Sequence, residues 1–203
     1  MSDERAEVND DLKLDPDFPA LFDAGERGPC QLYMISPPAI DPGFADRLKA
    51  ALHGGPVSAF QLRMKGAADQ EVIRAAAQLM PICREHDVAF ILNDRIDLAQ
   101  TCGADGVHLG QGDGDPQEAR RLLGPSVQIG VTCHDSRHLA MEAGEAGADY
   151  VAFGAFFPTA TKETAHRPDP SILGWWSALF EIPCVAIGGI TPANGRVLVE
   201  AGA

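Results

Sequence analysis

CGADGV at residues 102–107 returns as AGADYV at residues 146–151, and AGA stands again at residues 201–203. In each copy a segment with helical spacing precedes the glycine, and in the first two copies an apolar run follows the aspartate. Glycine readily takes the left-handed conformation that ends a helix. The motif therefore predicts a helix end followed directly by a buried strand, repeated as successive βα units. By the same logic we expect an eighth strand after residue 203.

The same alternation runs along residues 30–203. Short apolar runs rich in β-branched residues are followed by longer segments with helical spacing, which is typical of parallel βαβ proteins. The expected strands are 31–36, 57–65, 88–93, 106–109, 127–133, 150–155 and 184–188, and the expected helices lie near 44–53, 69–86, 95–102, 116–123, 135–146, 171–180 and 193–201. An open doubly wound sheet fits this alternation. So does a TIM (β/α)8-type barrel truncated after its seventh βα unit, since complete barrels usually need about 250 residues.

The composition is acidic, with 16 Lys and Arg against 29 Asp and Glu and a net charge of −13. Residues 1–29 carry much of this charge and lack a helical or strand period, so we expect a flexible acidic extension before a barrel at 30–203. The negative charge argues against nucleic-acid partners. No long apolar run or leader pattern is present, which predicts no membrane partner and a cytoplasmic location.

A polar stripe marks the end of the second expected strand. Gln61, Arg63 and Lys65 alternate with apolar residues, so their side chains share one face. In a barrel the carboxyl ends of the strands form the functional mouth, where an arginine and a lysine suit a diphosphate. The alternative is a charged strand end in solvent. Two cations and an amide on one face of an acidic protein favour the anion site.

Acidic side chains follow the next two strands. The apolar third strand ends in Asn93 and Asp94, and Asp113 lies on the loop after the fourth. Taken alone, Asn93 and Asp94 could form an Asx turn that enters the next helix. Two carboxylates on neighbouring loops, facing two cations, resemble a Mg²⁺ site that takes its other oxygens from substrate phosphates.

Polar groups also follow the later strands. Thr132 ends the fifth strand with a hydroxyl suited to a diphosphate oxygen, and Lys162 lies on a long polar loop of the kind that often binds ligands. The glycines at 188–189 predict exposed backbone amides before a helix, which suits an anion. His134 and His138 have helical metal-pair spacing, yet no glutamate lies between them, and we interpret His134 as a capping or packing residue.

The motifs, in chain order, are QxRxK at 61–65, ND at 93–94, HLGQxD at 108–113, GVTxH at 130–134, PTxTK at 158–162 and GGI at 188–190. Together they resemble the thiamine-phosphate synthase family over nearly all of residues 31–203. The resemblance implies a TIM barrel that joins hydroxymethylpyrimidine diphosphate to a thiazole phosphate carboxylate with Mg²⁺. The products would be thiamine monophosphate and diphosphate.

The resemblance also implies roles for individual residues. Three groups follow from it: a pyrimidine diphosphate site of Gln61, Arg63, Lys65, Asn93, Thr132 and Lys162, a Mg²⁺ site of Asp94 and Asp113, and a thiazole phosphate side of Thr159, Ala160, Thr161 and Gly189. Thr132 and the cations would stabilise the departing diphosphate. Such electrostatic catalysis needs no protein nucleophile, which agrees with the lack of a catalytic triad.

Three departures from the family pattern stand out. Thr132 replaces a frequent serine, Ala160 replaces a commonly polar residue, and the eighth strand is not among residues 1–203. Unpaired edges at the first and seventh strands would invite completion by another chain, so we expect either a truncated sequence or a homo-oligomer. Two other functions remain open: a thiazole tautomerase of the same fold and a non-catalytic binder of phosphorylated ligands.

Overall fold

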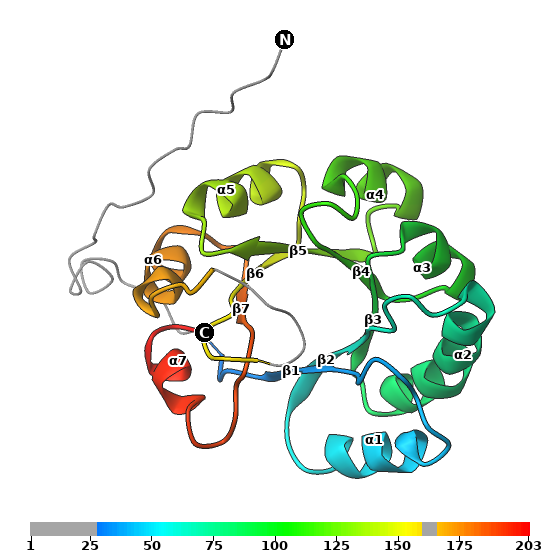
Figure 1. The fold of residues 1–203 in the computed structure, drawn as a ribbon. Helices are drawn as coiled ribbons and strands as arrows, with labels where there is room; N and C mark the ends of the chain where they lie inside the picture. The colour runs from blue at the N-terminus through cyan, green and yellow to red at the C-terminus, as the bar shows by residue number, and fades with distance from the viewer. Residues whose placement is uncertain (1–27, 160–165) are drawn as a thin grey trace.

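The computed structural model describes residues 28–159 and 166–203, which form a nearly closed α/β barrel (Figure 1). Its seven strands pair in parallel in the order β1-β2-β3-β4-β5-β6-β7, and the helices form an outer ring. The strands are β1 (Leu32–Ile35), β2 (Val57–Leu62), β3 (Ala89–Asn93), β4 (Gly106–Leu109), β5 (Gln128–His134), β6 (Tyr150–Phe153) and β7 (Cys184–Ala186). The helices are α1 (Phe44–Leu52), α2 (Asp69–Glu85), α3 (Ile96–Cys102), α4 (Pro116–Leu123), α5 (Arg137–Glu145), α6 (Ser171–Leu179) and α7 (Arg196–Glu200).

The strand order distinguishes between the two expected architectures. A doubly wound sheet reverses its order at a switch point, whereas here each strand lies beside its neighbours in the sequence. The TIM-type barrel is therefore confirmed, and the open sheet is excluded. Among the described residues, β1 pairs only with β2 and β7 only with β6.

One strand boundary differs from expectation in a way that matters for function. β2 ends at Leu62, earlier than the expected end at residue 65. Leu62 pairs with Leu92 of β3, and the chain then turns at Gly66, whose φ is 79°. Arg63 and Lys65 therefore stand on the loop after the strand, where they still reach the mouth of the barrel.

The glycine of the repeat has the same structural role in all three copies. Gly103, Gly147 and Gly202 take φ values of 65°, 91° and 109° at helix ends. The N–H of the next residue donates to the carbonyl five residues earlier in each case, which closes the helix. Asp105 and Asp149 then accept hydrogen bonds of 2.9 and 2.7 Å from backbone N–H groups of β3 and β5. Each aspartate thus ties the start of one strand to the strand beside it.

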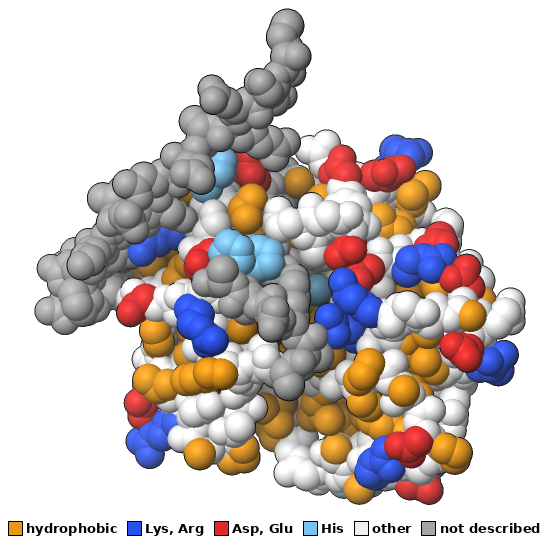
Figure 2. All heavy atoms as spheres, viewed as in Figure 1, with side chains coloured by type: hydrophobic (Ala, Val, Ile, Leu, Met, Phe, Trp, Pro, Cys, Tyr) orange, Lys and Arg blue, Asp and Glu red, His pale blue; other side chains and the backbone are white. Residues whose placement is uncertain are grey.

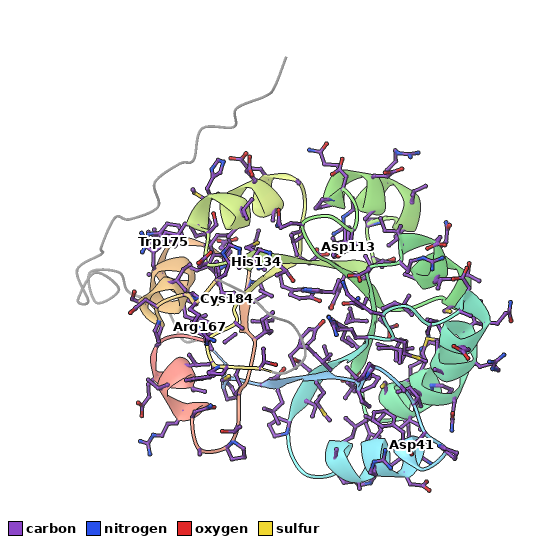
Figure 3. All side chains as sticks on the ribbon, in the orientation of Figure 1. Asp41, Asp113, His134, Arg167, Trp175 and Cys184 are labelled. Carbon is purple, nitrogen blue, oxygen red and sulfur yellow. The ribbon has the colours of Figure 1, made fainter. Side chains whose placement is uncertain are left out.

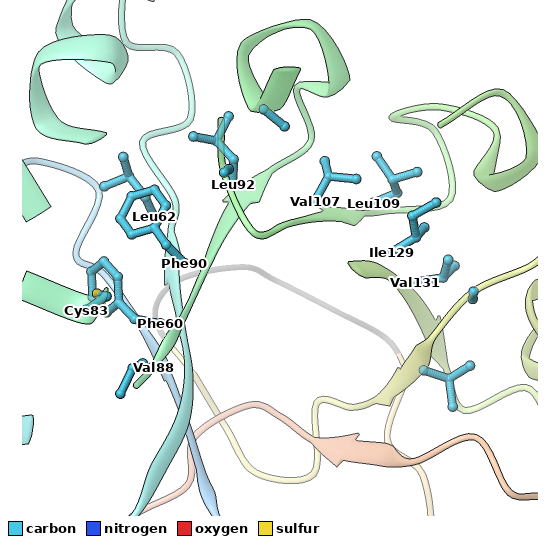
Figure 4. Close-up of a cluster of buried hydrophobic side chains, with 14 of the residues drawn as sticks. Phe60, Leu62, Cys83, Val88, Phe90, Leu92, Val107, Leu109, Ile129 and Val131 are labelled. Atoms are coloured by element: carbon cyan, nitrogen blue, oxygen red, sulfur yellow. The ribbon is translucent and has the colours of Figure 1, made fainter. Parts of the chain in front are cut away.

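Apolar side chains on the outer face of the sheet form the main core, between the strands and the helices (Figure 4). Phe60 and Leu62 of β2 and Phe90 and Leu92 of β3 are at most 1% exposed. Burying each such side chain stabilises the fold by roughly 1.5–3 kcal/mol. Because strand side chains alternate, the intervening residues point into the barrel. This interior is polar near the mouth.

Some sequence predictions fall outside the described residues. These are residues 1–27 of the expected acidic extension, and Ala160, Thr161 and Lys162 of the expected site. In the part of the chain that is described, no helix is long and apolar enough to cross a bilayer.

Candidate active site

A cavity of ≈ 420 Å³ opens at the carboxyl ends of the strands, the end at which barrel enzymes place their active sites. Figure 2 shows basic and acidic side chains side by side on this face of the molecule. The cavity is lined by all the described residues that the sequence places at the site: Gln61, Arg63, Lys65, Asn93, Asp94, Asp113, Thr132, Thr159 and Gly189. The predicted convergence of these residues is therefore observed.

Two carboxylates meet one ammonium group at this mouth. Lys65 Nζ lies 2.9 Å from Asp94 Oδ2 and 3.9 Å from Asp113 Oδ2. Figure 3 shows Asp113 at the inner rim of the barrel, whereas Asp41 lies at the periphery beside α1. Gly110 provides the space, because a Cβ atom there would overlap the Asp113 carboxylate. The loops after β2, β3 and β4 thus bring together three charged groups of the predicted site.

Asp94 is held in an unusual conformation. Its φ is 64°, and its N–H donates to the carbonyl of His108 at 2.8 Å. Non-glycine residues with positive φ are uncommon and cluster at functional sites. Burial raises the pKa of Asp94, and the neighbouring Asp113 adds to that rise against the opposing effect of Lys65. Helix α3 has Arg95 at its N-cap and no capping side chain, so the Asp94 carboxylate does not cap the helix.

A chain of hydrogen bonds crosses the barrel beneath these charges and joins five strands. Gln61 Nε2 donates to Tyr33 Oη at 2.9 Å, and Tyr33 Oη lies 2.7 Å from Tyr150 Oη. Tyr150 Oη lies 3.0 Å from His108 Nδ1, and His108 Nε2 lies 2.8 Å from Thr132 Oγ1. The sequence reasoning missed both tyrosines and this role of His108. Their polar side chains at interior-facing strand positions were the available signal.

Burial keeps this chain of groups neutral. It raises the pKa of Tyr33 to about 12 and lowers the pKa of His108 to about 4, where Arg63 adds to the lowering and Asp113 opposes it. Burial also raises the pKa of Tyr150. At neutral pH the His108 imidazole therefore has one N–H and one acceptor nitrogen.

His134 lies at the end of β5 and lines the cavity, so it forms no helical metal pair with His138. His138 Nε2 instead lies 3.3 Å from Glu142 on α5. The His134 ring stacks on His166 with a centroid distance of 4.6 Å, and His166 Nδ1 lies 2.7 Å from Asp135. These contacts agree with a packing role for His134, and they join residue 166, before α6, to the β5–α5 turn.

The glycines after β7 contribute to the cavity in a different way from that expected. Gly189 has a φ of 64° and packs so closely that a Cβ atom would overlap the Pro158 carbonyl. The helix that was expected near residue 193 begins only at Arg196. Thr191 N–H already donates to Asn194 Oδ1 at 2.7 Å. The Thr191 amide is therefore already occupied, whereas Gly188 and Gly189 both line the cavity.

Comparison with known proteins identifies the family. The family described as thiamine monophosphate synthase matches residues 32–203. The chain belongs to the thiamine monophosphate synthase family. Membership places it among the transferases of thiamine biosynthesis.

Individual members of the synthase family are similar over most of their length. A thiamine-phosphate synthase of Rhodospirillum centenum is 60% identical over 175 residues, which cover 86% of this chain and 84% of that protein. One from Erythrobacter litoralis is 62% identical over 179 residues, with the same coverage. The solved structure of thiamine phosphate pyrophosphorylase from Pyrococcus furiosus superposes with a TM-score of 0.75 at 34% identity, covering 85% of this chain and 82% of that one. The synthase family thus shares both the sequence and the barrel.

Proposed function

We propose that the chain transfers the pyrimidine methylene of hydroxymethylpyrimidine diphosphate to the ring nitrogen of a thiazole phosphate carboxylate. The products are thiamine monophosphate, diphosphate and the carbon dioxide that the thiazole carboxylate releases. The observation that carries this proposal is the meeting of Lys65 with Asp94 and Asp113 at the mouth of a cavity that Arg63 and Thr132 also line. This arrangement supplies both cations and carboxylates to one phosphorylated ligand.

Mg²⁺ fits the carboxylate pair. Asp94 and Asp113 already share a cationic partner in the Lys65 ammonium, which shows that their oxygens can face one positive centre. Among the described residues, no group of three or more His, Cys, Asp or Glu side chains could hold a metal. Mg²⁺ is usually bound through one or two carboxylates, with substrate phosphates as further ligands. A bound Mg²⁺ would supply positive charge to the leaving diphosphate.

The protein groups act on the bond that breaks. The C–O bond between the pyrimidine methylene and the diphosphate breaks, and its electron pair leaves with the diphosphate. Arg63 and Lys65 stabilise the negative charge that grows on these oxygens, and Thr132 donates a hydrogen bond to them. Lys162, on the loop after β6, is proposed to add a further cation. The thiazole nitrogen then uses its lone pair to form the new C–N bond. The bond from the thiazole ring to its carboxylate breaks, carbon dioxide leaves, and the electron pair that stays on the ring carbon takes up a proton.

The second substrate is proposed to bind beside β6 and β7. Thr159 and Gly189 line that side of the cavity, and the proposed site extends to Ala160 and Thr161. Because Gly189 approaches the Pro158 carbonyl closely, the loops after these two strands are held against each other. This proximity supports a single phosphate subsite built from both loops.

A diphosphate-release assay with both substrates tests the proposal. Release is expected only when the pyrimidine diphosphate, the thiazole phosphate and Mg²⁺ are all present. Asp94→Asn should reduce the rate at least tenfold, because charge near a metal is lost. The matched variant Asp41→Asn changes an exposed aspartate that pairs with Arg47 far from the cavity, and it should leave the rate unchanged. Metal-independent isomerisation of the thiazole would instead identify a tautomerase, and ligand binding without turnover would identify a binding protein.

A further inference from the structure

We infer that Tyr33, Tyr150 and His108 are positioning residues that turn the Thr132 hydroxyl proton into the cavity, toward an anionic ligand oxygen. The identity of that ligand as a diphosphate rests on the proposed function. The direction of the hydrogen bonds does not, because it follows from contacts within the protein.

The first step concerns Gln61, where the chain of hydrogen bonds begins. Its amide nitrogen donates to Tyr33 Oη, so this oxygen acts as an acceptor there. The Tyr33 hydroxyl proton then needs an acceptor of its own. The oxygen of Tyr150, at 2.7 Å, is its partner among the described residues. The proton of Tyr33 therefore points toward Tyr150.

The second step carries this direction to the other end. Tyr150 accepts from Tyr33 and donates its own proton to His108 Nδ1 at 3.0 Å. A neutral imidazole with Nδ1 as an acceptor has its proton on Nε2. The Nε2–H group donates to Thr132 Oγ1 at 2.8 Å. The Thr132 oxygen is thereby an acceptor within the protein, and its own proton is left to donate into the cavity that it lines.

The surroundings preserve this arrangement. His108 and Tyr150 are each 7% exposed, and such burial disfavours a charged imidazole. Gly130 on β5 faces the Tyr150 ring, and a Cβ atom at that position would overlap the ring. The reverse direction would leave the Tyr33 hydroxyl proton without an acceptor among the described residues. It would also make Thr132 a donor to His108, so that its hydroxyl proton could not serve the ligand.

The His108 tautomer tests this direction without any substrate. Nitrogen-15 NMR of the labelled protein should show His108 with a protonated, pyrrole-type Nε2 and an unprotonated, pyridine-type Nδ1. The His108→Asn variant identifies its signals among those of the six histidines. Tyr150→Phe removes the donor to Nδ1 and should produce a mixture of tautomers. A protonated Nδ1 in the unmodified protein would overturn the inference.

A double-mutant cycle tests whether Tyr150 affects ligand binding through Thr132. Binding of inorganic diphosphate with Mg²⁺, measured by calorimetry, should weaken roughly tenfold in Thr132→Val, since a hydrogen bond to a charged group is lost. Tyr150→Phe should weaken it in the same direction, and the double variant should bind no more weakly than Thr132→Val alone. Thr101→Val, which removes an exposed hydroxyl bonded to the Asp97 carbonyl, is the matched control and should bind normally.

The outcomes separate the two proposals. If the losses in the double variant simply add, Tyr150 acts on the ligand directly and the positioning role is wrong. If the unmodified protein fails to bind diphosphate, the proposed function is wrong, whereas the NMR result still decides the direction of the hydrogen bonds.

Discussion

Gly130→Ala is expected to damage both stability and ligand binding, because this position on β5 faces the Tyr150 ring. The new methyl group would overlap the ring, so the ring must move. Tyr150 would then lose its hydrogen bonds to Tyr33 at 2.7 Å and to His108 at 3.0 Å. The substitution therefore tests whether the space beside Gly130 is needed to hold the Tyr150 ring in its hydrogen bonds.

The magnitude follows from three contributions. Overpacking a core with one extra methyl typically costs about 1–3 kcal/mol, and two lost hydrogen bonds cost about 1 kcal/mol each. Replacing a strand glycine by alanine returns about 0.5–1 kcal/mol of chain entropy. The free energy of unfolding should fall by about 3 kcal/mol. With a urea m-value of about 3 kcal/mol per molar, the midpoint should fall by about 1 M.

The assay is urea denaturation followed by far-ultraviolet circular dichroism, run beside calorimetry with diphosphate and Mg²⁺. Gly55→Ala is the matched control, because Gly55 lies on an exposed turn with nothing within 4 Å of a new Cβ atom. It should leave both measurements unchanged. An unchanged urea midpoint together with unchanged diphosphate affinity in Gly130→Ala would refute the reasoning.

Three further predictions concern other parts of the barrel. Gly110→Ala should push the Asp113 carboxylate away and raise the Mg²⁺ concentration for half-maximal activity about tenfold. An unchanged midpoint of urea denaturation is the control. His108 stays neutral until about pH 4, whereas an unfolded histidine protonates near pH 6.5, so acid favours unfolding. The free energy of unfolding should therefore fall by about 3 kcal/mol between pH 6.5 and 4. Urea titrations at each pH measure this fall, and it should be absent in His108→Asn. Arg120→Lys removes a guanidinium group that donates to three backbone carbonyls and to Asp149. The free energy of unfolding measured in urea should fall by about 2 kcal/mol, without a change in diphosphate affinity.

Much of the charged part of the site could be predicted from the sequence. Arg63, Lys65, Asp94 and Asp113 each follow a strand, and the carboxyl ends of parallel strands meet at one end of a barrel. Convergence of these residues therefore required only the correct fold. Even the error in the end of β2 did not change the outcome, because a loop residue at the strand end reaches the same mouth.

The neutral part of the site could not be predicted in the same way. Tyr33 and Tyr150 are 117 positions apart, and no local pattern links them. Likewise, the entry of α7 depends on the Thr191–Asn194 hydrogen bond, which a glycine pair followed by proline does not reveal.

The sequence by itself determined the repeating βα unit and the charges at the strand ends, because these depend on local periodicity and on chain direction. The strand order that makes the sheet a barrel was decided by the tertiary structure. Only the tertiary structure decided which interior side chains touch. Contacts across a barrel depend on strand register and on the space left by residues such as Gly130, and both arise from packing among segments distant in the chain.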